Sequence, residues 1–166
     1  MKRLFAILLT TLPVLGFAKE VYVDGLYYNI IEGTTQAEVI SCGREGDIVI
    51  PSTITENGIE YKVTSIGDNV FNSSYITSIE IPASVTSIGS GAFEYCSALS
   101  TIDIPSGVTR IGSSAFCACS SLTSIKIPSG VTSIESDTFY KCYNLTSIDI
   151  PSSITSIKSG AFSGCI

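Results

Sequence analysis

The chain has 166 residues, with nine Lys and Arg against fifteen Asp and Glu, and its formal net charge at neutral pH is −6. It contains no His, which removes the usual general base of enzymes and the commonest metal ligand. The acidic balance argues against nucleic acid and anionic membrane surfaces as partners, because both attract clustered Lys and Arg.

The first eighteen residues have the composition of an export signal. Lys2 and Arg3 precede a short apolar run, and the small residues Gly16 and Ala18 stand at the positions that a signal peptidase reads. The run is too short for a membrane span, and no other stretch is long and apolar enough to cross a bilayer. We predict that residues 1–18 are removed and that the mature chain is secreted, periplasmic or held at the cell surface. Removal takes away two of the nine basic residues and none of the fifteen acidic ones, so the mature net charge is −8.

We predict that residues 19–62 form a β-rich N-terminal cap that covers the open end of a solenoid. This segment holds three strand-like runs, at 21–23, 26–31 and 37–40. Asn57-Gly58 also predicts an inserted hairpin, because this pair readily supplies the two positive φ values of a tight turn.

Residues 63–166 are predicted to be repeats of about 23 residues. Full copies begin at Ile81, Ile104 and Ile127, a shortened unit precedes them, and a last copy that begins at Ile150 is incomplete. A fixed period in the twenties means that each copy is one unit that buries its apolar face only by stacking on its neighbours. The sequence therefore predicts a repeat solenoid of strand-dominated α/β coils.

Each repeat is predicted to start its coil with a strand. In the second copy, Ile102 and Ile104 alternate with outward-facing Thr101 and Asp103, which is typical of a half-buried strand. Pro105 ends this strand because it cannot donate to the ladder. The predicted core columns of the second copy are Ile104, Val108, Ile111, Phe116, Cys119, Leu122 and Ile125.

A short capped helix is predicted for the last part of each repeat. Ala115, Phe116, Cys119 and Leu122 recur at helical spacing, and Ser113 stands just before them. Ser and Asp favour a helix start, because the side-chain oxygen accepts a hydrogen bond from the first free amides. The equivalent residues of the other units are Asp68, Ser90, Ser136 and Ser159.

The recurring motif is I-P-x-x-V-T-x-I-x-x-x-A-F-x-x-C-x-x-L-x-x-I, visible at 81–102 and 104–125. It resembles the BspA-like leucine-rich repeats of exported and surface proteins of anaerobic bacteria and some mucosal protists. The segments 23–28, 50–52 and 57–61 also resemble the start of such proteins. The resemblance implies a leucine-rich-repeat solenoid with a curved strand face and, for some members, adhesion to host proteins or other cells. It implies no catalytic residues.

We therefore predict an exported leucine-rich-repeat module, not an enzyme, that binds a protein through its exposed strand face. The partner would be a host extracellular protein or another cell-surface protein, and we expect no cofactor and no metal. Two alternatives are a structural fragment of a longer surface protein without its own ligand, and a glycan-binding module. The glycan-binding alternative would use Tyr95, Tyr140 and Tyr143.

The candidate binding residues form two columns, because residues i and i+2 of a strand share one face. The hydroxyl column is Ser78, Thr101, Ser124 and Ser147, and the charged column is Glu80, Asp103, Lys126 and Asp149. The alternative is that both columns serve only solubility.

Four cysteines fall at one position of successive coils: Cys96, Cys119, Cys142 and Cys165. We expect a buried ladder of reduced thiols, since stacked equivalents send their Cβ vectors parallel. Disulfide pairing is the alternative, because export favours oxidation and adjacent coils lie within disulfide range. Cys42 and Cys117 lie off this ladder, and their state stays open.

The last copy stops before its Leu and its next strand. Its apolar positions Ile150, Ile154, Ile157 and Phe162 would then lack a following coil. Uncovered apolar surface next to unpaired strand edges favours association. We expect self-association through this coil, or poor order after about Ser153.

Overall fold

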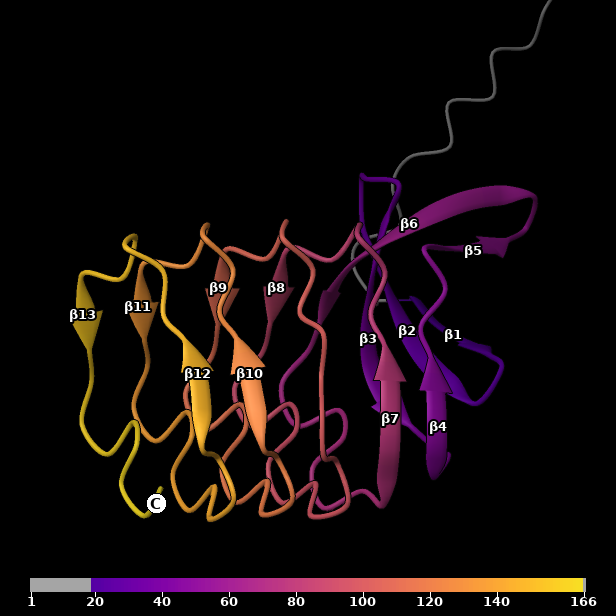
Figure 1. Cartoon of the computed structure of the whole chain (residues 1–166). Helices are drawn as coiled ribbons and strands as arrows, with labels where there is room; N and C mark the ends of the chain where they lie inside the picture. Colours follow the sequence, from indigo (N-terminus) through magenta and orange to yellow (C-terminus); the bar gives the residue numbers. More distant parts are fainter. Residues whose placement is uncertain (1–18, 166) are drawn as a thin grey trace, which may run out of the picture.

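The computed structural model describes residues 19–165, and the predicted export signal lies outside them. The described chain is a strand-dominated solenoid that stands beside a small sheet at its N-terminal end (Figure 1). Equivalent residues of successive coils pair directly, as Ser124 does with Ser147, 23 residues later. The predicted solenoid and its repeat length are therefore confirmed.

The N-terminal sheet is an antiparallel meander that continues into the solenoid. It consists of β1 (Lys19–Val23), β2 (Leu26–Ile31) and β3 (Gln36–Cys42). β3 pairs in parallel with β6 (Ile59–Ile66), so the meander joins the first strand ladder. β5 (Thr53–Glu56) pairs antiparallel with β6, and Asn57 and Gly58 form the turn between them with φ values of 52° and 77°.

Two parallel ladders run along the solenoid. The first ladder, which we call the strand face, consists of β4 (Gly46–Val49), β7 (Ile76–Glu80), β10 (Ser124–Lys126) and β12 (Ser147–Asp149). Strand pairing joins β4 to β7 and β10 to β12, and Thr101, in the coil between β7 and β10, bridges to Ser124 of β10. The second ladder has two segments: β6, β8 (Ser87–Ile88) and β9 (Arg110–Ile111) pair in succession, and β11 (Ser133–Ile134) pairs with β13 (Ser156–Ile157). Figure 1 shows the two ladders on opposite sides of the coils.

The predicted short helices are wrong, since the described residues contain strands and turns but no helix. Two residues with positive φ, four positions apart, interrupt the segment in each coil. The pairs are Asn69 and Ser73, Gly91 and Tyr95, Ser114 and Ala118, Asp137 and Lys141, and Gly160 and Gly164. A right-handed helix cannot contain such residues. Ser113 is therefore no N-cap, and its carbonyl accepts a hydrogen bond from the Gly91 amide at 2.9 Å.

The turns replace helices because their amides bond across the coil interface. The amides of Phe93 and Tyr95 donate to carbonyls of the next coil, at 2.8 Å each, whereas the Glu94 and Cys96 amides donate three residues back. On the second ladder the direction is reversed, and the Gly112 amide donates to the Ile88 carbonyl of the preceding coil at 2.9 Å. A helix would direct all its amides along its own axis, so the turns add bonds between coils that helices cannot make.

Stacked phenylalanines run through the centre of the solenoid. Phe71, Phe93, Phe116, Phe139 and Phe162 lie with adjacent ring centroids 5.2 to 5.7 Å apart and nearly parallel planes. All seven core columns predicted for the second copy are buried. The predicted core columns are therefore confirmed. Because these side chains point inward, the residues that alternate with them on the strand face point outward.

The cysteines of the ladder are free thiols. Each Sγ donates to the carbonyl of a phenylalanine in the preceding coil, at 3.0 Å for Cys96, Cys119 and Cys142 and 3.1 Å for Cys165. Cys42 and Cys117 are also free. Burial raises the pKa of Cys96 and Cys142 to about 12 and that of Cys117 to about 11. These thiols are therefore protonated at neutral pH and weak nucleophiles.

Candidate binding surfaces

The strand face brings the two predicted columns together in register. Ser124 lies opposite Ser147, and Lys126 lies opposite Asp149. Thr101 pairs with Ser124 and extends the hydroxyl column toward the cap. All eight predicted residues are exposed: Ser78, Glu80, Thr101, Asp103, Ser124, Lys126, Ser147 and Asp149. Because neighbouring strands lie about 4.8 Å apart, each column is a closely spaced row.

β4 extends both columns by one strand, which the sequence interpretation missed. Asp47 pairs with Ser78, and Val49 pairs with Glu80. The signal was present, because Asp47-Ile48-Val49-Ile50-Pro51 has the same alternation and the same final proline as residues 101–105. The strand face therefore begins at the cap and not at β7.

Asp47 is a fixed anion at the start of the hydroxyl column. Its Oδ1 accepts hydrogen bonds from the hydroxyls of Ser78 and Thr77, at 2.7 Å each. These two bonds, with Ser78 contributing more, hold the pKa of Asp47 below its usual value. Asp47 therefore stays ionised over the whole neutral range.

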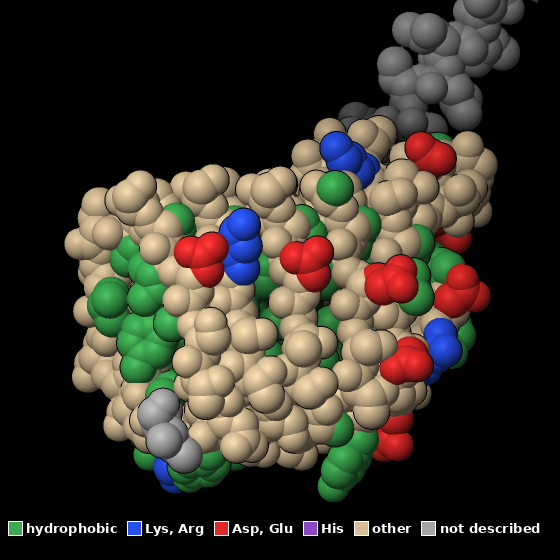
Figure 2. Space-filling view, viewed as in Figure 1, with side chains coloured by type: hydrophobic (Ala, Val, Ile, Leu, Met, Phe, Trp, Pro, Cys, Tyr) green, Lys and Arg blue, Asp and Glu red, His purple; other side chains and the backbone are tan. Residues whose placement is uncertain are grey.

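The two columns carry a negative surplus. Four members are carboxylates and one is an ammonium group: Asp47, Glu80, Asp103 and Asp149, and Lys126. Figure 2 shows this row across the middle of the face, with one blue side chain among red ones. The two ion pairs found among residues 19–165, Lys19–Glu56 and Lys158–Glu135, lie elsewhere. The charges of the strand face are therefore available to a partner.

A groove of about 470 Å³ follows the charged column where the strands end. Its walls include Asp103, Lys126 and Asp149 together with the prolines of three successive coils. An extended segment that lies across the strands would contact the charges and the prolines together.

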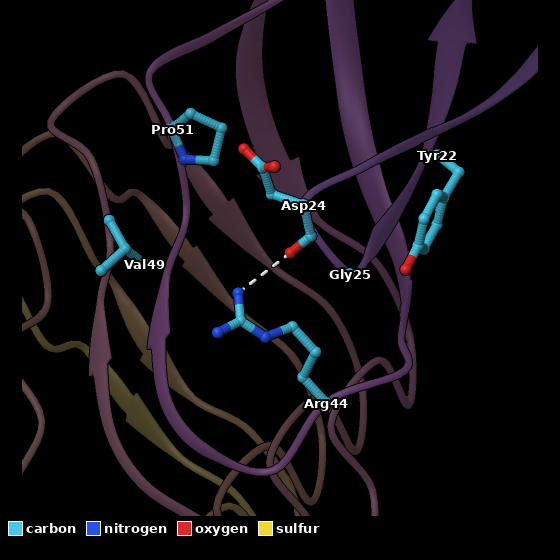
Figure 3. Close-up of a pocket in the computed structure, with 6 residues that line it drawn as sticks. All are labelled: Tyr22, Asp24, Gly25, Arg44, Val49 and Pro51. Atoms are coloured by element: carbon cyan, nitrogen blue, oxygen red, sulfur yellow. Dashed lines mark hydrogen bonds between the residues drawn. The ribbon is translucent and has the colours of Figure 1, made fainter.

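A larger pocket of about 630 Å³ lies between the cap and the first strand of the strand face. Tyr22, Asp24, Gly25, Arg44, Val49 and Pro51 line it, and Figure 3 shows their arrangement. Arg44 Nη1 donates to the Asp24 carbonyl at 3.1 Å. No sequence pattern pointed to this pocket, because Asp24 and Arg44 are twenty positions apart and meet only through the fold.

The turns opposite the strand ends hold a groove of about 460 Å³. Tyr75, Tyr95 and Tyr143 line it and are 66%, 55% and 46% exposed, and Lys141 lies beside them. Tyr75 was not among the predicted tyrosines, although it follows the position equivalent to the cysteine ladder, as Tyr143 does. Tyr140 does not line the groove, and its ring lies 5.0 Å from the Lys141 ammonium.

Residues 19–165 hold no group of three or more His, Cys, Asp or Glu side chains that could bind a metal ion. The same part of the chain has no helix long and apolar enough to span a bilayer. The arrangements that the structure does provide are a long polar face and open grooves.

Solved structures with this fold come from bacterial leucine-rich repeat proteins. A leucine-rich cell surface protein from Faecalibacterium prausnitzii is 32% identical, with a TM-score of 0.72, and the match covers 90% of this chain and 47% of that one. The T. pallidum leucine-rich repeat protein is 28% identical, with a TM-score of 0.77 and coverage of 87% and 67%. A leucine-rich repeat protein from Bacteroides capillosus is 28% identical, with a TM-score of 0.64 and coverage of 84% and 97%. The chain thus spans about half the length of the F. prausnitzii protein.

No match was found among curated protein sequences. The family described as "BspA type Leucine rich repeat region" matches residues 48–166 in six copies. This match covers well over half of the chain and coincides with the stacked coils seen in the structure. The chain therefore belongs to the BspA-type leucine-rich repeat family.

Proposed function

We propose that the chain is an exported module that binds a protein partner on the strand face, in a cell-surface adhesion or interaction system. The observation that supports this most is the pair of exposed columns, which are in register from β4 to β7 and again from Thr101 through β10 to β12. Complementary charge steers association and selects partners, so the negative surplus of the face favours a partner with a basic patch. The description of the F. prausnitzii relative as a cell surface protein supports a location outside the cell.

A binding assay on an immobilised mature chain tests this proposal. The chain would be presented to purified extracellular matrix proteins and to surface proteins of neighbouring cells. Exchange of Asp103 and Asp149 for Lys should weaken the binding of a captured partner at least tenfold. The control is Thr132→Lys, an exposed position beside the second ladder, which should leave affinity unchanged. Equal loss in both variants would refute the strand face as the site.

Export is a separate part of the proposal. Removal of residues 1–18 would leave Lys19 at the N-terminus of the exported protein. Mass spectrometry of the protein recovered outside the cytoplasm should find this terminus. Protein retained inside the cell with Met1 in place would contradict it.

Glycan binding is the second candidate function, and the turn groove is the observation that favours it. Tyrosine rings offer flat apolar faces with a polar tip, and three exposed tyrosines line this one groove. A glycan array would test this, with Tyr95→Ala and Tyr143→Ala expected to abolish any signal. Tyr22→Ala, an equally exposed tyrosine at the cap, is the control. Absence of binding to both proteins and glycans would favour the structural-fragment alternative.

Self-association is proposed for the coil that ends the described chain. Ile150 and Ile157 are exposed there, and Figure 2 shows hydrophobic side chains gathered at the β13 end. Light scattering of the mature chain should find dimers or larger species, and Ile157→Lys should shift them toward monomer. A strictly monomeric unmodified chain would contradict this.

A further inference from the structure

We propose that the pocket between the cap and the strand face is a carboxylate-binding subsite, with Arg44 as the group that binds the anion. The inference rests on the proposed function, because the carboxylate would belong to the protein that binds the strand face. The inference specifies which chemical group one end of that ligand would carry. The supporting observations are the positioning of Arg44, its free donors, the walls of the pocket and the charges that follow it.

The Arg44 side chain is held in place by the β1–β2 turn. Its Cγ and Cδ lie so close to Gly25 that a Cβ at this position would overlap them. Gly25 has a φ of 86°, a conformation that favours glycine. Arg44 Nη1 donates to the Asp24 carbonyl at 3.1 Å. These contacts restrain the exposed Arg44 side chain at its stem and at its tip, which lowers the entropy lost when a ligand binds.

Most of the Arg44 donors remain available. A guanidinium has five N–H groups in a planar fork, and the structure assigns one hydrogen bond to it, the bond to Asp24. Among the described residues Arg44 forms no ion pair, since the two that occur involve Lys19 and Lys158. A planar fork matches the two oxygens of a carboxylate, so this chemistry fits the pocket better than a point-like anion.

Two apolar side chains flank the guanidinium. Tyr22 is 62% exposed and Val49 is 59% exposed, and Figure 3 shows them on either side of Arg44, with Pro51 above Val49. The Asp24 carboxylate also lines the pocket, but it is directed away from the guanidinium. A carboxylate seated between these side chains would be partly withdrawn from water, which strengthens its attraction to the guanidinium. Tyr22 and Val49 would also contact the carbon atoms next to the carboxylate.

The pocket opens onto the charged column. Val49 lines the pocket and pairs with Glu80 of β7, and Asp103 follows in the next coil. A ligand that lies across the strands would therefore meet one cation and then two carboxylates, at steps of about 4.8 Å. The fitting ligand has a carboxylate followed within a few residues by Lys or Arg. The carboxylate can come from a chain terminus or from an Asp or Glu side chain.

Short synthetic peptides distinguish these two sources. The first has two lysines near a free C-terminal carboxylate, the second is the same peptide with an amidated end, and the third is amidated but ends in Glu. Isothermal titration would give affinities, and the Nε–Hε resonance of Arg44 in labelled protein would report contact. We expect at least one carboxylate form to bind tenfold tighter than the carboxylate-free amide and to shift the Arg44 resonance, and the form that does so identifies the source.

Variants connect the effect to Arg44. Arg44→Gln should abolish the preference for the carboxylate, and Lys62→Gln, which removes an exposed cation away from the pocket, should retain it. Val49→Asp leaves Arg44 intact but places a carboxylate of the chain itself beside it, so this variant should also abolish the preference for a carboxylate peptide. It replaces Arg44→Gln as the test if that variant does not fold. Equal affinity for all three peptides, or an unmoved Arg44 resonance at millimolar peptide, overturns the subsite. The strand-face proposal would survive that result, because the Asp103 and Asp149 exchanges test it separately.

Discussion

The thiol of Cys119 donates a hydrogen bond to the carbonyl oxygen of Phe93 in the preceding coil, at 3.0 Å. The same carbonyl also accepts the Cys96 amide, at 3.1 Å. The cysteine column therefore connects successive coils through sulfur–oxygen contacts and is more than an apolar filler. A thiol that is buried and engaged with a carbonyl is not directed at the sulfur of the next coil, which favours the reduced ladder.

Thiol labelling tests this arrangement. In the native protein at neutral pH, Cys96, Cys119 and Cys142 should react slowly with iodoacetamide, because burial raises the pKa of each thiol. In denaturant without a reductant, all six cysteines should react, since none would be held in a disulfide. Mass spectrometry of the labelled peptides is the measurement. Cysteines that stay blocked in denaturant would show pairing.

Alkaline pH should destabilise the fold. The pKa of Cys96 and of Cys142 is about 12 in the folded chain, against an ordinary value of 9.0. A thiol whose pKa is raised by folding stabilises the native state fully below the unfolded pKa, and that contribution is lost as the pH rises toward the folded pKa. The free energy of unfolding, measured in urea, should therefore fall between about pH 9 and pH 12.

The control is a variant with Ala at Cys96, Cys119 and Cys142. It should start from a lower stability, and its decline over the same pH interval should be shallower. A decline as steep as that of the unmodified chain would assign the effect to other groups.

Truncation in the phenylalanine stack tests the register of the repeat. Phe116 is fully buried, with the Phe93 and Phe139 rings at 5.3 and 5.7 Å. Phe116→Ala should lower the free energy of unfolding by about 3 to 5 kcal/mol, the usual range for a buried aromatic. Lys126→Ala removes an exposed side chain and should change stability by less than about 0.5 kcal/mol. Similar losses in the two variants would mean that inward and outward positions have been exchanged.

Tyr28→Phe should preserve or increase stability. Tyr28 is completely buried in the cap, and its hydroxyl has no hydrogen-bond partner among the described residues. An unsatisfied buried polar group costs about 1 to 3 kcal/mol, and Phe removes the hydroxyl while it keeps the ring. Urea unfolding should show an unchanged or higher midpoint. A clear loss of stability would reveal a bond that this hydroxyl makes.

The sequence predicts the strand face well because a strand alternates with period two and each coil repeats it. That alternation alone predicts that Thr101 and Asp103 point outward, and both side chains are exposed. The predicted helices were wrong for a physical reason. Successive three-residue turns also bring apolar residues inward at three-residue spacing, as with Phe116 and Cys119, and this spacing resembles that of a helix. Tyr95, Ala118 and Lys141 adopt positive φ, and none of these residue types predicts that conformation.

The candidate surfaces could be predicted only where they follow the repeat. Neither Tyr22 nor Arg44 belongs to a repeated position, and the cap pocket depends on how the β1–β2 turn meets the loop before β4. Tyr75 and Tyr143 do occupy equivalent positions, but the groove between them depends on the small residues Ser97 and Ser120 at that position in the two intervening coils. Pockets of this kind depend on residues that differ from one coil to the next, and a consensus motif does not include those residues.

The opposed directions of the amide bonds on the turns and on the second ladder have a consequence for the length of the solenoid. Each coil both gives and receives bonds at each of its two neighbours, so a 23-residue unit inserted between two coils would meet the same donors and acceptors that it replaces. The number of coils can therefore change without loss of backbone hydrogen bonds between coils. The outward-facing side chains of each coil can differ as well, because they take no part in those bonds. The exposed surface of such a solenoid can be extended, or its residues changed, one coil at a time, without a change in the hydrogen bonds that hold the coils together.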